Sequence, residues 1–166
     1  RLSDSVLAAR PALSLHASRA LYLAGQMERA ESLLRQAEMT LRDADSGELT
    51  ASAAVYRAAM NAMRGEGLTT AAATMRHLLD RPETMSIHTA ARAADTLGLA
   101  RELAGDTVTA EQAYRQAAEL ARAAGVAYLA INARCECALV QITRGQLASA
   151  EETCRLALDS TDEEAL

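Results

Sequence analysis

Apolar residues recur along this chain at spacings of three and four, which is the period of one face of an α-helix. The first clear stripe runs through Met27, Ala30, Leu34 and Ala37. The same +3, +4, +3 spacing returns later, at Thr107, Ala110, Tyr114 and Ala117 and at Leu147, Ala150, Cys154 and Ala157. The pattern predicts amphipathic helices that each bury one stripe.

Four glycines, Gly25, Gly65, Gly105 and Gly145, lie 40 residues apart and separate these helical patterns. A fixed period of this length is typical of stacked helix hairpins, because one hairpin cannot bury its own apolar face. Glycine allows the tight turn between the two helices of a hairpin. We therefore predict one all-α repeat domain over residues 1–166. Its four antiparallel hairpins, about eight helices, are expected at roughly residues 11–43, 48–81, 86–125 and 126–160.

The turn of the second hairpin is the least regular. Gly67 places Ala72 five residues later, which matches the distance from Gly25 to Ala30, so we predict that Gly67 rather than Gly65 forms this turn. Ala30, Ala110 and Ala150 are expected to be buried where paired helices cross. Residues Ser3-Asp4 could cap a further short helix before Pro11.

Composition favours helices and argues against binding to nucleic acid. Alanine is abundant, aromatic residues are 2% of the chain and only two prolines interrupt it. All 17 basic residues are arginine, yet the net charge is −5 and no basic run occurs. A duplex binder normally concentrates positive charge on one face, so we expect no direct nucleic-acid contact from this segment.

No constellation typical of catalysis or metal binding is present. Ser14, His16 and Ser18 lack an orienting acid and are expected to be surface polar groups. The three cysteines, Cys135, Cys137 and Cys154, lack the usual spacing of zinc ligands, and we expect reduced thiols that mostly lie in the core of a cytoplasmic protein. The sequence predicts no enzyme activity, no metal, no cofactor and no membrane span.

The columns of small residues resemble the tetratricopeptide repeat (TPR). That family has small residues on the first helix, a turn glycine, alanine five residues later and another small residue seven further on. Ala37, Ala117 and Ala157 fill the last column, and Leu79 departs from it. The resemblance implies a right-handed superhelical solenoid of about four TPR-like hairpins.

Two segments, residues 10–31 and 125–158, also look like the TPR region of MalT-type regulators of the LuxR family. Such regulators carry an ATPase module, a helical sensor region and a helix-turn-helix. No Gly-x4-Gly-Lys-Ser/Thr motif occurs here. Because the chain begins at Arg1 rather than Met, we expect a fragment, namely the sensor region alone.

In TPR domains the first helices of the hairpins line a concave groove, and the register of this sequence indicates which side chains would face it. They are polar and of mixed charge, and their planar donors suit oxyanions, hydroxyls or amides. The expected groove residues are His16, Arg19, Tyr22, Arg57, Asn61, Arg64, Arg92, Asp95, Thr96, Asn132 and Glu136, with Glu102 and Cys135 beside them. Arg57 and Asn61 resemble half of a carboxylate clamp, but Glu136 would repel a terminal carboxylate.

Two functions follow from these observations. The first is an effector-sensing domain of a MalT-like transcriptional regulator, which binds a small molecule or a partner protein in the groove. The second is a general scaffold that binds a peptide or a partner helix. In both cases the exposed ends of the repeat array could support self-association.

Overall fold

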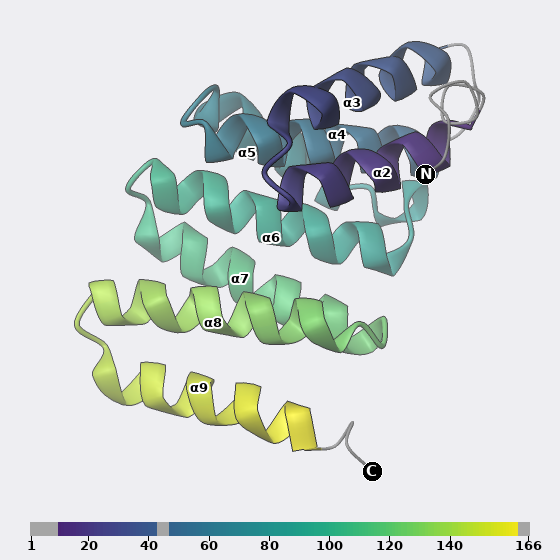
Figure 1. Ribbon diagram of the computed structural model, residues 1–166. Helices are drawn as coiled ribbons and strands as arrows, with labels where there is room; N and C mark the ends of the chain where they lie inside the picture. Colours follow the sequence, from purple (N-terminus) through teal and green to yellow (C-terminus); the bar gives the residue numbers. More distant parts are fainter. Residues whose placement is uncertain (1–9, 43–46, 163–166) are drawn as a thin grey trace. The chain divides into compact units, whose positions relative to one another are not determined.

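The computed structural model describes residues 10–42 and 47–162, with side chains to residue 159 (Figure 1). The chain divides into two compact units, residues 1–57 and 58–166. The described residues form eight α-helices and no strand, which confirms the all-α prediction for this part of the chain. The helix possible near Ser3-Asp4 lies outside the described residues.

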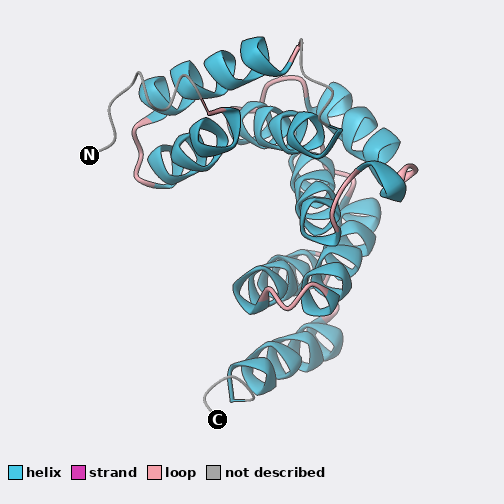
Figure 2. Cartoon of the chain, turned by 90° about the vertical axis from the view of Figure 1, so that its right-hand side faces the viewer, coloured by secondary structure: helices cyan, strands magenta, loops and turns pink. Residues whose placement is uncertain are grey.

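The helices follow one another through short loops (Figure 2). Their bounds are α2 (Pro11–Leu23), α3 (Met27–Leu41), α4 (Gly47–Met63), α5 (Leu68–Leu79), α6 (Ile87–Leu103), α7 (Thr107–Ala123), α8 (Ala127–Thr143) and α9 (Leu147–Asp162). A 3-10 turn, Pro82–Thr84, precedes α6. The boundary between the two units falls within α4.

The first unit contains the α2–α3 hairpin and the first part of α4. Ser14 and Ser18 are buried rather than on the surface. Ser18 Oγ donates a hydrogen bond of 2.7 Å to the carbonyl of Ala30 on α3. His16 between them is exposed. The sequence interpretation of the two serines was therefore wrong, and at least Ser18 joins the helices of the hairpin.

In the second unit each of the helices from α5 to α9 packs against the next in the chain, and α6 also touches α8. Alanine makes close approach possible at these contacts. One core cluster contains only alanines, Ala94, Ala117, Ala118 and Ala133, with Leu79 and Leu120 at its edge. Another joins Ala110 and Tyr114 of α7 to Cys137 and Val140 of α8.

The hairpin turns share one backbone pattern. Gly105 N–H donates to the carbonyl of Glu102 and Asp106 N–H to that of Arg101, both at 2.8 Å. Gly65 makes the equivalent bond to Ala62 at 2.8 Å with φ +73°, which a residue with a Cβ rarely adopts. Gly65 therefore ends α4, and the preference for Gly67 was wrong. Gly67 instead precedes the first residue of α5.

The alanine column is buried as predicted: Ala30 and Ala110 are 0% exposed, Ala72 2% and Ala150 3%. The cysteines follow the prediction only in part. All three are free thiols, but Cys135 and Cys154 are exposed and only Cys137 is buried. Cys135 and Cys154 therefore lie outside the contacts between helices, whereas Cys137 belongs to the core cluster with Ala110 and Tyr114.

Replacing Ala110 with leucine should lower the free energy of unfolding by about 1–3 kcal/mol through overpacking. Ala110 is fully buried against Tyr114, Cys137 and Val140, so the larger side chain has no room. Thermal or urea unfolding measures the loss. The same substitution at Ala148, which is exposed on α9, is the control and should change stability little. Equal stability of Ala110→Leu and the parent chain would contradict the prediction and show that the core can accommodate a leucine side chain at this position.

Candidate functional site

The predicted groove residues are divided between the two units. His16, Arg19, Tyr22 and Arg57 belong to the first unit, and the other seven belong to the second. Within the first unit His16 is exposed, and Arg19, Tyr22 and Arg57 are half-buried. Within the second, Asn61 lies near the end of α4, and Arg64 lies in the turn that follows. The remaining five lie on α6 and α8.

Arg57 is engaged by carboxylates of its own chain. Its guanidinium donates to both oxygens of Glu38 on α3, through Nε at 2.9 Å and NH2 at 2.8 Å, and it also pairs with Glu31. The hydrogen bonds to Glu38, and then those to Glu31, raise the pKa of Arg57 while burial opposes the rise. Arg57 therefore fastens α4 to α3 instead of offering a guanidinium to a ligand.

Thr96 also departs from the expected role, because it is 4% exposed and cannot reach a ligand in a groove. Its neighbours in the predicted set, Arg92 and Asp95, are half-buried on α6. On α8, Asn132 is exposed and Glu136 half-buried. Besides Asn61 and Arg64, four of the predicted groove residues in the second unit are therefore at least partly exposed. They lie on one side of α6 and α8 and are Arg92, Asp95, Asn132 and Glu136.

Acidic side chains of α6 and α8 come together around Tyr114 of α7. Tyr114 Oη on α7 donates a hydrogen bond of 2.8 Å to Glu102 Oε2 on α6. Burial, then this bond, and then the charges of Glu102, Glu136 and Asp95 raise the pKa of Tyr114. Burial, with the charge of Glu102, also raises the pKa of Glu136. Asp95, Glu102 and Glu136 thus place three carboxyl groups near Tyr114 on this face.

Replacing Glu136 with glutamine should stabilise the chain at pH 7. A carboxyl with a raised pKa binds its proton more tightly when folded than when unfolded, so its ionisation destabilises the fold. This destabilisation is fully present at pH values above the pKa of Glu136 in the folded state. It disappears at pH values below the pKa of the unfolded state, about 4.3. The melting temperature of Glu136→Gln should therefore exceed that of the parent at pH 7, and the difference should vanish towards pH 4.

The control for this experiment is Glu119→Gln, since the Glu119 side chain is 67% exposed and its pair with Arg122 lies at the surface. It should show little difference from the parent at either pH. A Glu136→Gln difference that stays constant between pH 7 and pH 4 would contradict the assignment of a raised pKa.

A pocket that the sequence did not predict lies between α7, α8 and α9. Its volume is about 440 Å³, within the range usual for small-molecule sites. Arginine, hydroxyl and amide groups line it together with two glutamates and apolar atoms. The lining residues are Arg115, Ala118, Glu119, Arg134, Cys137, Gln141, Ser149, Glu152, Thr153 and Leu156. None of them belongs to the predicted groove set, since that prediction used first helices, whereas this pocket is bounded mainly by the second helices α7 and α9.

A buried polar network supports the wall of this pocket. Gln141, which is fully buried, donates from Nε2 to Glu111 Oε1 at 3.0 Å and accepts from Thr153 Oγ1 at 2.9 Å. Glu111, 7% exposed, also pairs with Arg115 on its own helix and with Arg144 at the end of α8. The network holds α7, α8 and α9 in fixed register and leaves the hydroxyl of Thr153 at the pocket.

Two further features set the chemistry of the pocket. Burial raises the pKa of the Cys137 thiol, and a hydrogen bond with Arg115 opposes the rise, so the thiol is no activated nucleophile. Arg134 NH1 donates to the carbonyl of Leu156 at 2.9 Å, which places its guanidinium across the gap between α8 and α9. The arrangement is suited to binding a polar molecule.

Comparison of the chain with family models, with curated proteins and with solved structures finds no match. Over residues 10–42 and 47–162, no helix is both long and apolar enough to span a bilayer. In the same part of the chain, no group of three or more His, Cys, Asp or Glu side chains is arranged to hold a metal ion.

Proposed function

We propose that this chain is a ligand-binding regulatory module and that its effector occupies the pocket between α7, α8 and α9. The observation that carries the proposal is the pocket itself, about 440 Å³ in volume and lined by Arg115 and Arg134. In this proposal the hairpins continue as a right-handed TPR-like solenoid. The module then serves as the cytoplasmic sensor region of a MalT-like regulator of the LuxR family, a role that rests on the sequence resemblance.

The position of the pocket provides a route from binding to regulation. Arg115 and Glu119 come from α7, the second helix of one hairpin, whereas Ser149 and Glu152 come from α9, the second helix of the next. A ligand that contacts both helices favours one spacing of the two hairpins over others. Such differential affinity is what shifts a population between conformational states.

The lining also indicates the class of effector. Two guanidinium groups can bind a carboxylate or phosphate, and the amide and hydroxyl groups can bind sugar hydroxyls. Glu119 and Glu152 make a strongly anionic ligand less favourable than one that carries a single anionic group among several hydroxyls. We therefore propose a small hydroxylated molecule, such as a sugar or sugar acid.

The test is a thermal-shift screen of the chain against sugars, sugar acids and sugar phosphates. A ligand at 100 times its Kd stabilises a fold by about 2.7 kcal/mol, which corresponds to a rise of about 5–10 °C in Tm for a chain of this size. Ser149→Trp should abolish the rise because the indole fills the pocket from its exposed rim. Ala148→Trp, one residue away and also exposed, should retain it.

Two results would refute the pocket as the effector site. One is a panel in which no compound changes the Tm of the parent chain. The other is a shift that persists at full size in Ser149→Trp.

The alternative function, a scaffold that binds a peptide or helix, is favoured by one observation. The charges of Asp95, Glu102 and Glu136 act on Tyr114 together, so this face is suited to a basic segment. Anisotropy titration with an arginine-rich peptide separates the two functions. Binding that Glu102→Gln weakens and Ser149→Trp leaves intact would support the scaffold.

A further inference from the structure

The polar network in the wall of the pocket fixes the direction of its hydrogen bonds. The carboxylate of Glu111 pairs with the guanidinium groups of Arg115 and Arg144, so its oxygens accept hydrogen bonds and have no proton to donate. Gln141 must therefore turn its Nε2 towards Glu111, and Nε2 lies 3.0 Å from Oε1 of that residue. The reverse orientation of the amide would place two acceptors against each other. Glu111 thus sets the orientation of the Gln141 side chain.

This orientation determines what Thr153 can offer to a bound molecule. Because Nε2 of Gln141 is directed at Glu111, its Oε1 faces Thr153, and the hydroxyl of Thr153 donates its only proton to that oxygen at 2.9 Å. Gln141 is fully buried and cannot reach a ligand, whereas Thr153 is half-buried and lines the pocket. For a ligand the Thr153 hydroxyl therefore has only the lone pairs of Oγ1, which accept hydrogen bonds.

The bonded pair of Gln141 and Thr153 differs from what two other hairpins carry at the same two positions. Counted from the turn glycines, the corresponding residues are Leu21 and Leu33 in the α2–α3 hairpin and Arg101 and Ala113 in the α6–α7 hairpin. Leu33 and Ala113 are buried, so an apolar side chain at the position of Thr153 is compatible with the contact between paired helices. The threonine is therefore not needed to close a hairpin, and it lies where the pocket is.

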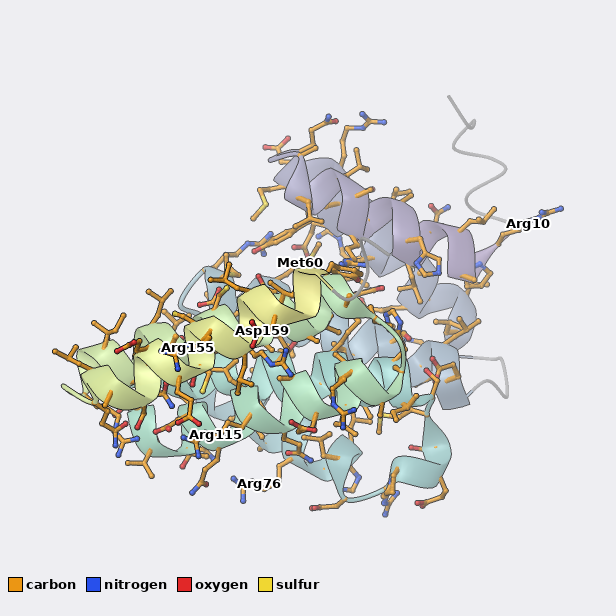
Figure 3. All side chains as sticks on the ribbon, turned by 90° about the horizontal axis from the view of Figure 1, so that it is seen from below. Arg10, Met60, Arg76, Arg115, Arg155 and Asp159 are labelled. Atoms are coloured by element: carbon orange, nitrogen blue, oxygen red, sulfur yellow. The ribbon has the colours of Figure 1, made fainter. Side chains whose placement is uncertain are left out.

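The other polar groups of the pocket make Thr153 its most sheltered acceptor. Arg115 and Arg134 can only donate hydrogen bonds. Among the lining side chains that can accept one from a ligand, Glu119, Ser149 and Glu152 are exposed. Figure 3 labels Arg115 on α7 and Arg155 on α9, two residues after Thr153, and so marks the two helices that supply most of the lining.

We propose that Thr153 selects the effector and that Gln141 positions the Thr153 hydroxyl for this task. The bound molecule must present a hydrogen-bond donor, a hydroxyl group of a sugar or sugar acid, to Oγ1 of Thr153. This inference rests on the proposed function of the pocket. A carbonyl, ether or phosphate oxygen at the same place would bring lone pairs against lone pairs, and a site built to bind a hydroxyl group rejects such an analogue.

The test compares two variants of Thr153 on every compound of the screen that raises the Tm of the parent chain, with affinities from isothermal titration calorimetry. Thr153→Val has nearly the same shape but no acceptor, and it should weaken binding about three- to tenfold. Thr153→Ser keeps the hydroxyl and should stay within about twofold of the parent. Thr143→Val is the matched control. The Thr143 hydroxyl also donates within the chain, to the carbonyl of Leu139 at 3.0 Å, but lies outside the pocket lining, so binding should not change.

Keto derivatives test the direction of the bond. The panel pairs each hydroxylated compound with keto derivatives, such as D-gluconate with 2-keto-D-gluconate and 5-keto-D-gluconate, in which a carbonyl that only accepts replaces one hydroxyl group. A compound that binds should have a keto derivative that binds the parent chain about tenfold more weakly. That derivative should lose no further affinity in Thr153→Val, since the bond is already missing. In Gln141→Leu the Thr153 proton can turn to the pocket, so the difference between the two compounds should shrink.

A measurement on the chain without ligand tests the relay by itself. Thr153→Val removes the donor to Oε1 of Gln141, so NMR should show a shift of the side-chain carbonyl carbon of Gln141. The Nε2–H resonances, which report on Glu111, should stay nearly in place. A shift confined to the Nε2–H resonances would show the reverse orientation of the amide and overturn the inference.

The binding experiments separate this inference from the proposed function. Equal affinity of the parent and Thr153→Val for every bound compound would overturn the role of Thr153 and leave the pocket as an effector site. The same holds if keto derivatives bind the parent as tightly as the hydroxylated compounds. A panel in which no compound changes the Tm would refute the proposed function and this inference with it.

Discussion

Replacing Glu111 with alanine is expected to lower the free energy of unfolding by about 3 kcal/mol, the combined cost of an unsatisfied buried amide and a broken ion pair. Glu111 accepts hydrogen bonds from Gln141 and Arg115 and pairs with Arg144. Gln141 is fully buried, so its Nε2 would lose the acceptor that it has in the parent chain. Arg144 is 26% exposed and can turn to solvent, which limits the loss.

Glu151→Ala is the control, because Glu151 holds the same register in α9 and also pairs with an arginine four residues later. That pair is exposed on both sides, and such pairs contribute about 0–1 kcal/mol. Urea unfolding of the two variants measures the difference. If both variants lost the same stability, the buried network around Gln141 would contribute nothing beyond a surface ion pair.

The sequence predicted the helices and the buried alanine column because both depend on local periodicity. Ala30, Ala110 and Ala150 share a stripe that repeats at a fixed distance from a turn glycine, and all three are buried. The repeated sequence pattern also showed that Glu111 follows Ala110, but it could not predict which side chains bind the Glu111 carboxylate. Gln141 and Arg144 lie 30 and 33 residues later, and only the packing of α8 on α7 brings them to Glu111.

The sites were harder to predict, because they depend on which side chain lies opposite another. Arg57 was placed correctly on a first helix, but the carboxylates of Glu31 and Glu38 that engage it come from α3. The pocket was missed because most of its lining comes from the second helices α7 and α9, whereas the prediction followed the first helices. The turn at Gly65 was misassigned because the distance from Gly67 to Ala72 matches that from Gly25 to Ala30, whereas the hydrogen bond that ends α4 is made by Gly65.

Replacing Gly98 with alanine is expected to destabilise the chain by about 3 kcal/mol, although the same change inside a helix normally stabilises by about 0.5–1 kcal/mol. Gly98 is buried in the middle of α6. A Cβ at this position would lie 2.6 Å from Cδ1 and Cε1 of Tyr114 and 2.9 Å from its Cγ. Tyr114 is 1% exposed and hydrogen-bonded to Glu102, so its ring cannot move aside.

Two of the other hairpins show what occurs where no tyrosine faces this position. In the α2–α3 hairpin the equivalent pair is Ser18 with Leu34, and in the α8–α9 hairpin it is Ala138 with Cys154. Small residues with a Cβ thus occur where the opposing side chain is not aromatic. The volume of the tyrosine ring is accommodated by the absence of a side chain at position 98.

A double-mutant cycle with Tyr114→Leu, the side chain found in the α2–α3 hairpin, tests this explanation by thermal or urea unfolding. Tyr114→Leu alone should destabilise, since it removes the ring and its bond to Glu102. On that background Gly98→Ala should cost nothing, or stabilise by up to about 1 kcal/mol through helix propensity. A cost of Gly98→Ala that is the same with tyrosine and with leucine at position 114 would show that the ring does not select the glycine.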